Sequence, residues 1–170
     1  MPLRLESGKN IFTLSPREVS QLCPAVSGSE CVVLLIKPDE TLYFIGKIRL
    51  ALLHGSVSLM GTTVKPSSAF IQVFSPKTHS LPSLAGNVPE KSMDGFRNDF
   101  PSRIREHLEP THSIVALTTD TSGLDFLSRL SSVFEGLFDV DWDHDERYLS
   151  GFHPVSKQWG TRTVEIIFPI

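Results

Sequence analysis

The sequence predicts a mainly β domain with a few short helices, an α+β class built as an antiparallel β-sandwich or jelly-roll-like domain with helices packed at its edge. The prediction depends on the segment from Thr41 to Phe74, where glycine and proline residues separate three extended runs. In the first run, large apolar residues fall on even positions, whereas Lys47 and Arg49 occupy odd ones. This alternation is typical of a strand with one buried face. The three runs together predict a β-meander at the centre of a sandwich or small barrel.

Residues 1–30 are predicted to form an N-terminal arm with one short helix. Ser15 can cap the free backbone amides of a helix start, Pro16 suits the first helical position, and Glu18 stands where a capping box has its acidic member. We expect this helix to end near Cys23-Pro24, because proline cannot continue it.

Residues 31–138 are predicted to form the sandwich domain. The run Cys31–Ile36 is apolar throughout, which is typical of a strand buried on both faces, and a turn at Pro38-Asp39-Glu40 should lead into the long strand. Ser113–Thr118 is a second compact β run. The stretch from His79 to Gly95 is rich in Ser, Pro, Gly and Asn, which predicts a strand end followed by a surface loop.

Two amphipathic helices are expected in the second half of the chain. The first tolerates Pro101 only within its first turn and should end before Pro110, so it forms a short helix laid on the sheet. The second begins at Ser122, where Asp125 completes a helix cap. The apolar positions are Phe96, Phe100, Ile104 and Leu108 in the first helix and Leu127, Leu130, Phe134 and Leu137 in the second.

Residues 139–170 are predicted to form an acidic loop followed by a C-terminal strand at Arg162–Phe168. Carboxylates alternate along Asp139–Glu146, as they do in calcium loops. An EF-hand starting at the first of them would need glycine where His144 stands and glutamate where Ser150 stands. A solvated acidic loop is therefore favoured over a metal site, and its charge can repel or select a basic partner.

The composition fits one intracellular, soluble globular domain. With 170 residues, 40% of them hydrophobic, the chain can bury roughly two thirds of its unfolded surface. Its two cysteines, Cys23 and Cys31, form no CxxC pair, which argues against a disulfide framework or a four-ligand zinc site. The net charge of −3 and the lack of a basic run argue against an extended nucleic-acid footprint. The sequence shows neither a secretion signal nor a membrane span.

The sequence contains no P-loop, no serine-hydrolase elbow and no histidine metal motif. A phosphate-binding P-loop needs a glycine five residues before a Gly-Lys pair and a hydroxyl residue after it, and neither Gly8-Lys9 nor Gly46-Lys47 meets this requirement. No serine lies in a GxSxG elbow, and the six histidines show no HxH or HExxH spacing. The sequence therefore assigns no catalytic, cofactor-binding or metal-binding residue.

Contact with RNA or a partner is predicted on the outer face of the first long strand. Tyr43, Lys47 and Arg49 share that face, where an aromatic ring and two positive charges can stack on and neutralise a strand of RNA. The alternative is a polar outer face that only keeps the sheet soluble. Weaker candidates for the same contact are Lys65, Lys77, Arg103 and Arg105.

Glycine and aromatic residues recur in a fixed order along the central region. The first four motifs are an aromatic-x-Gly strand, a Leu-x-Gly turn, a short strand ending in glycine and a Phe-Ser-Pro strand exit. Two more motifs follow later in the chain, a Gly-Leu helix start and a Phe-x-x-Leu-Phe exit. These motifs are Phe44-Ile45-Gly46, Leu53-His54-Gly55, Gly61, Phe74-Ser75-Pro76, Ser122-Gly123-Leu124 and Phe134-Glu135-Gly136-Leu137-Phe138. From about Cys31 to Phe138, the sequence resembles the N-terminal domain of the polynucleotide 5′-hydroxyl-kinase family, in its nucleolar pre-rRNA-processing branch.

The resemblance implies a β-sandwich that has no catalytic residue of its own and that acts in pre-rRNA processing and ribosome biogenesis. The domain would dock to the kinase domain of the same protein, to RNA or to an endoribonuclease partner of the pre-rRNA processing complex, in the nucleus and nucleolus. ATP and magnesium would bind only in a kinase domain, which this sequence lacks and toward which residues 139–170 would lead.

Two other functions stay open at this point. One is an independent β-sandwich interaction module without any kinase, because the apolar run Thr163–Ile170 can add to the edge of a partner's sheet. The other is an enzyme of its own, whose motif the sequence does not reveal.

Overall fold

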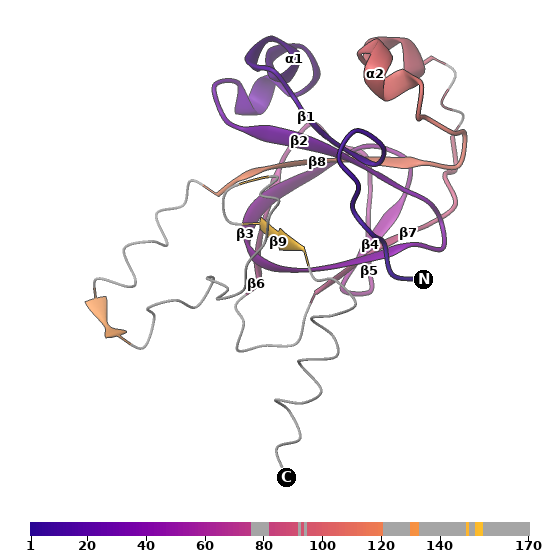
Figure 1. Ribbon diagram of the computed structural model, residues 1–170. Coiled ribbons are helices and arrows are strands. Elements are labelled where there is room, and N and C mark those ends of the chain that lie inside the picture. The colour runs from indigo at the N-terminus through magenta and orange to yellow at the C-terminus, as the bar shows by residue number, and fades with distance from the viewer. Residues whose placement is uncertain are drawn as a thin grey trace.

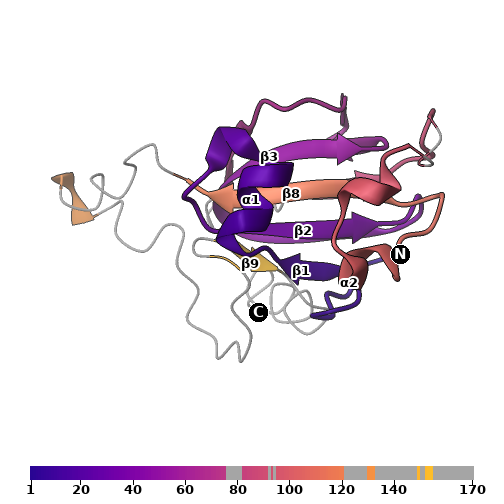
Figure 2. The same ribbon diagram turned by 90° about the horizontal axis from the view of Figure 1, so that it is seen from above.

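The computed structural model contains two antiparallel sheets joined through one long strand, with short helices over the outer face of the larger sheet (Figure 1, Figure 2). It describes residues 1–75, 82–91, 93, 95–120, 130–132, 149 and 152–154. Within these residues the strand pairs are all antiparallel. The predicted fold class, a mainly β sandwich with a few short helices, is confirmed.

The larger sheet is built around a strand that is buried on both faces. Its order is β1 (Ile11–Thr13), β2 (Cys31–Ile36), β8 (Ser113–Thr119), the second half of β3 (Thr41–His54) and β6 (Ile71–Ser75). Every residue of β2 is buried, because hydrophobic side chains pack on both of its faces. This confirms the prediction made from its uninterrupted apolar run.

The smaller sheet continues from the first half of β3. There β7 (Ser83–Gly86) pairs with the start of β3, and the hairpin of β4 (Val57–Leu59) and β5 (Thr62–Val64) extends the sheet beyond β7. The strand β9 (Phe152–Pro154) pairs with the middle of β3. Because β3 belongs to both sheets, it links the two layers of the sandwich.

The predicted meander is wrong in its order of strands. Although β3 and β4 are neighbours in the sequence, β3 pairs with β6, β7, β8 and β9, whereas β4 pairs with β5 and β7. The chain changes sheet at Gly55, where φ is +96° and a Cβ atom would overlap the Ser113 hydroxyl and lie 2.8 Å from Ser113 Cα. Only glycine suits both the conformation and the space. This corner sends β4 into the smaller sheet.

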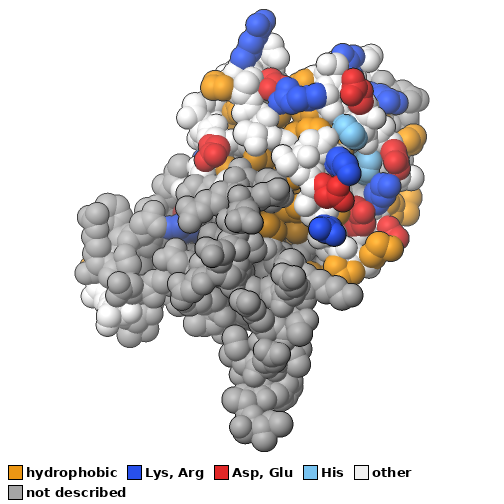
Figure 3. Space-filling view, viewed as in Figure 1, with side chains coloured by type: hydrophobic (Ala, Val, Ile, Leu, Met, Phe, Trp, Pro, Cys, Tyr) orange, Lys and Arg blue, Asp and Glu red, His pale blue; other side chains and the backbone are white. Residues whose placement is uncertain are grey.

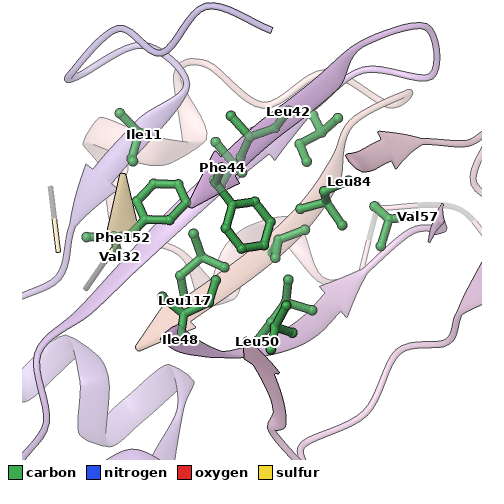
Figure 4. Close-up of a cluster of buried hydrophobic side chains, with 14 of the residues drawn as sticks. Ile11, Val32, Leu42, Phe44, Ile48, Leu50, Val57, Leu84, Leu117 and Phe152 are labelled. Carbon is green, nitrogen blue, oxygen red and sulfur yellow. The ribbon is translucent and has the colours of Figure 1, made fainter. Parts of the chain in front are cut away.

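The main hydrophobic cluster fills the space between the two sheets (Figure 4). The even-numbered apolar residues of β3 lie in it, as their alternation predicted: Leu42, Phe44, Ile48, Leu50 and Leu52 are all buried. The Phe44 ring packs against the Phe152 ring of β9, with 5.7 Å between the centroids. Side chains of this size each contribute roughly 1.5–3 kcal/mol when they leave water, so the burial of this layer contributes strongly to stability.

A second hydrophobic cluster lies between the outer face of the larger sheet and the helices. The helix α1 (Pro16–Leu22) begins with the predicted capping box: the Ser15 hydroxyl accepts from the Glu18 N–H, and the Glu18 carboxylate accepts from the Ser15 N–H. The short 3-10 helix η1 (Pro24–Val26) follows at once. The predicted end of α1 before Pro24 is therefore confirmed.

The helix predicted from the four apolar positions after Gly95 is shorter than their spacing indicates. The chain instead forms η2 (Arg97–Asp99) and α2 (Ser102–Arg105), because Pro101 takes an extended conformation and stands before the first turn of α2. Phe100 and Ile104 are nevertheless buried in the second cluster. The apolar pattern thus predicted burial correctly and helix length incorrectly.

The stretch His79–Gly95, predicted as a strand end and a surface loop, also contains the complete strand β7. Its short run carries only one large apolar residue, Leu84, which is fully buried in the main cluster. The predicted acidic loop and the strand Arg162–Phe168 lie outside the described residues, as does nearly all of the helix predicted from Ser122.

Candidate RNA or partner contact site

The three predicted contact residues lie along one strand without forming one patch. Tyr43, Lys47 and Arg49 occupy odd positions of β3, and at a rise of about 3.3 Å per residue Tyr43 lies roughly 20 Å from Arg49. Ile45, between them, is fully buried. Tyr43 is exposed, whereas Lys47 and Arg49 are half-buried. The continuous polar stripe expected from alternation is therefore interrupted.

Arg49 is anchored to the neighbouring strand. Its Nε donates a hydrogen bond to the Thr119 carbonyl oxygen at 3.0 Å, which ties β3 to the end of β8. On the other side, Arg49 stands opposite Gln72 of β6, so the two side chains share one face of the sheet. The bond to Thr119 uses one of the five guanidinium N–H donors, and the four on the terminal nitrogens form no hydrogen bond with the described residues.

An open hollow of about 490 Å³ lies beside Arg49. Two residues of η1 form one side of it, Arg49 belongs to β3, and Phe70 with the first two residues of β6 forms the remaining side. Phe70 also packs against the second cluster, and Ile71 is 43% exposed. The lining residues are Ala25, Val26, Arg49, Phe70, Ile71 and Gln72. The hollow therefore combines an apolar wall with one guanidinium and one amide.

Sequence reasoning identified Arg49 and missed the β6 side of the hollow. In the run before Pro76, Phe70, Gln72 and Phe74 occupy every second position. In a strand, this spacing indicates that their side chains lie on the same face of the sheet. The pairing that sets Gln72 opposite Arg49 depends on β6 returning to β3. Nothing in the sequence indicated that return, because the meander model placed β6 elsewhere.

The other basic candidates do not gather at the hollow. Lys47 stands opposite Phe74 on the same face. Lys65 is exposed after β5, and Lys77 lies outside the described residues. On the helical side, the Arg103 guanidinium binds Glu18, and Arg105 ends α2.

Two histidines are buried without forming a metal site. His54 at the end of β3 stacks on Phe96 with 5.6 Å between ring centroids, and its Nε2 atom has no hydrogen-bond partner. The His112 Nδ1 accepts from the Glu109 N–H at 2.8 Å. Burial lowers the pKa of both histidines. Among the described residues, no group of three or more His, Cys, Asp or Glu side chains could hold a metal ion.

The two cysteines are free and both are buried in the second cluster. A hydrogen bond from Cys31 lowers the pKa of the Cys23 thiol, and the same contact together with burial raises the pKa of Cys31. Because Cys23 is 2% exposed and Cys31 is fully buried, neither thiol is accessible as a surface nucleophile.

The surface carries charges of both signs. On the face shown in Figure 3, Lys and Arg side chains are interspersed with Asp and Glu side chains over the helices and the strands below them. Such mixing produces no broad positive field on this face, so attraction of an anion to this face must be local. No helix within the described part of the chain is both long and apolar enough to cross a membrane.

Comparison with known proteins gives a consistent set of similarities. Residues 21–134 match the sequence model of the family described as polynucleotide 5′-hydroxyl-kinase NOL9, N-terminal domain. This match includes η1, β3 and β6, and therefore every residue that lines the hollow.

Curated fungal proteins are also similar to the chain, each called polynucleotide 5′-hydroxyl-kinase grc3. The protein from Neosartorya fischeri is 28% identical over 159 residues, and the protein from Aspergillus clavatus is 34% identical over 159 residues. In both cases the alignment covers 88% of this chain and 19% of the relative. The chain thus spans about a fifth of the length of these relatives.

Proposed function

Because this chain belongs to the family of polynucleotide 5′-hydroxyl-kinase N-terminal domains, we propose that it is the non-catalytic domain of an RNA 5′-hydroxyl kinase that acts in pre-rRNA processing and ribosome biogenesis. The domain provides docking surface rather than chemistry. It packs on the kinase domain of the same protein and contacts RNA or an endoribonuclease partner, in the nucleolus.

The match of residues 21–134 to an N-terminal domain carries this proposal. The relatives that bear the kinase name are much longer than the chain, which covers 19% of them, so they have room for a separate phosphate-binding domain. Neither Gly-Lys pair of this chain has the spacing of a P-loop. ATP and magnesium accordingly belong to that other part of the protein.

A local surface feature of the structure supports the docking role. Sandwich folds carry many unrelated functions, so the role must come from specific surfaces. The hollow beside Arg49 and the exposed side chains of β6 offer such a surface, with apolar and cationic groups together. The mixed charge on the face shown in Figure 3 offers no general attraction for an anion, which favours recognition at a local site such as this one.

A kinase assay tests the proposal. An RNA 5′-hydroxyl kinase transfers the γ-phosphoryl group of ATP to the 5′ oxygen and releases ADP. The full-length product of the gene should phosphorylate RNA that ends in a 5′-hydroxyl, and the 170-residue chain alone should not. In cells that lack the protein, pre-rRNA fragments with unphosphorylated 5′ ends should accumulate.

Two results would contradict the proposal. A full-length product without any RNA 5′-kinase activity would exclude the parent enzyme, and unaltered pre-rRNA ends after depletion would exclude the pathway. A full-length protein with its P-loop lysine replaced is the matched control, because it keeps this domain intact while removing the phosphate contact.

A further inference from the structure

The hollow beside Arg49 has the side chains that single-stranded RNA needs at one nucleotide. RNA-binding sheets combine an aromatic ring for stacking, a cation for the phosphate and polar groups for the base edge. Here Phe70, Arg49 and Gln72 supply one of each, and all three line the same hollow. The hollow has a volume of about 490 Å³ and is open to solvent, so it offers a shallow contact surface rather than an enclosing pocket.

The positions of these side chains are set by the fold. The Nε of Arg49 is tied to the Thr119 carbonyl oxygen, and Phe70 packs against the second hydrophobic cluster. Gln72 stands opposite Arg49 in the β3–β6 pair, so its amide lies on the face that holds the guanidinium. Because Arg49 and Phe70 are held in this way, these two side chains lose little freedom when a ligand binds.

The charge of the hollow favours an anion. Among the described residues that line it, none is acidic, and Arg49 carries the one charged group. A guanidinium matches the geometry of a phosphate through two parallel N–H donors. An acidic peptide would satisfy this charge too, but it would leave the aromatic ring and the amide without the stacking and edge contacts that a base provides.

The geometry points to a nucleotide-binding subsite for single-stranded RNA in this hollow, with the phosphate on Arg49, the base against Phe70 and the base edge on Gln72. This inference rests on the proposed function, since it assigns the RNA contact of the domain to one place. It also changes the contact set predicted from the sequence: Arg49 stays, whereas Tyr43 lies outside the hollow.

Binding of a labelled oligouridylate to the 170-residue chain tests the subsite, with fluorescence anisotropy measured at low and at physiological salt. Replacing Phe70→Leu removes the ring and should weaken binding on the order of tenfold, whereas Phe70→Tyr keeps the ring and should bind normally. Arg49→Gln should reduce the slope of log K against log salt by about 0.7, the value for one phosphate contact of a single strand.

Two further variants serve as matched controls. Arg4→Gln also removes one positive charge, in the segment before β1, and β1 lies at the opposite edge of the larger sheet from β6. The Arg4→Gln variant should bind the oligouridylate like the unaltered chain. Tyr43→Leu removes an exposed aromatic from the same strand as Arg49 and should have little effect. The thermal midpoint of each variant shows whether it is folded.

Each contrary outcome overturns the subsite in a distinct way. If RNA binds but folded Phe70→Leu and Arg49→Gln bind it normally, the RNA contact lies elsewhere. If Tyr43→Leu is the damaging change, RNA follows β3 instead of the hollow. If the chain binds no RNA at low salt but binds polyglutamate through Arg49, the occupant is an acidic peptide. In all three cases an active full-length kinase would leave the proposed function intact.

Discussion

Glu18 and Arg103, which stand 85 residues apart in the sequence, form a two-pronged ion pair that joins the two helical segments over the larger sheet. The two terminal nitrogens of Arg103 donate to the two Glu18 carboxylate oxygens at 2.6 and 2.7 Å. The Nη2 atom also donates to the Thr13 carbonyl oxygen at 2.9 Å. Glu18 also accepts from the Ser15 N–H in the capping box. One carboxylate therefore starts α1 and holds α2 beside it.

Replacing Arg103→Gln should lower the free energy of unfolding by about 1–2 kcal/mol, because charge-assisted, two-pronged bonds are stronger than ordinary surface pairs. Urea denaturation followed by circular dichroism measures this change. The matched control is Lys9→Gln, which breaks the Lys9–Glu6 pair, whose side chains are 69% and 48% exposed. That change should cost less than about 0.5 kcal/mol. Equal effects for the two variants would contradict the structural role of Arg103.

The same pair predicts a loss of stability in acid. The hydrogen bonds from Arg103 lower the pKa of Glu18 from 4.5 to about 2. As the pH falls, the Glu18 carboxylate is protonated in the unfolded chain before it is protonated in the folded one. The stability that the ion pair contributes is therefore fully present above pH 4.5 and is lost as the pH falls toward 2. The difference in stability between the unaltered chain and Glu18→Gln should therefore shrink across this window. A difference that stays constant with pH would mean that the ion pair does not form in solution.

A second loss of stability should appear at a higher pH because of His54. Burial lowers the pKa of His54 below its ordinary value of about 6.5, so the folded state disfavours the charged ring. The stabilisation is present above about pH 6.5 and is lost as the pH falls below it, since the unfolded chain binds the proton more readily. His54→Phe keeps a ring against Phe96 and should make this part of the stability profile less steep, while the buried His112, whose pKa is also lowered, keeps its own contribution. His107→Gln is the control, because it removes a histidine at an exposed position and leaves the buried His54 in place.

The parts of the fold that the sequence predicted correctly depend on local patterns. The capping box at Ser15, the buried strand Cys31–Ile36 and the alternating side chains of β3 each depend on residues a few positions apart. The strand order does not depend on such local patterns, because β6 and β8 pair with β3 from distant parts of the sequence. The strand β7 was missed because four residues with one large apolar side chain resemble a loop.

The candidate site shows the same limit. Alternation placed Lys47 and Arg49 on one face correctly, but it could not show that Ile45 between Tyr43 and Lys47 is buried. The hollow exists because η1, β3 and β6 meet, and this meeting depends on long-range pairing. Phe70 and Gln72 therefore became candidates only from the structure. The family resemblance, in contrast, depended on glycine positions that are fixed by backbone geometry, and Gly55 at the corner between the sheets is one of them.

Gly86 should be the most sensitive glycine in the smaller sheet. A Cβ atom there would overlap the Lys37 carbonyl oxygen and lie 2.8 Å from Ile36 Cγ2, and the Gly86 N–H donates to the Glu40 carbonyl oxygen at 2.9 Å. Because these neighbours are backbone and a buried side chain, they cannot move aside without disturbing β2. Gly86→Ala should therefore lower the free energy of unfolding by roughly 1–3 kcal/mol. Gly95→Ala is the matched control, since a Cβ atom at Gly95 meets nothing within 4 Å. Thermal denaturation of both variants measures the contrast, and a Gly86→Ala midpoint equal to that of Gly95→Ala would show that β7 does not pack against the end of β2 as described.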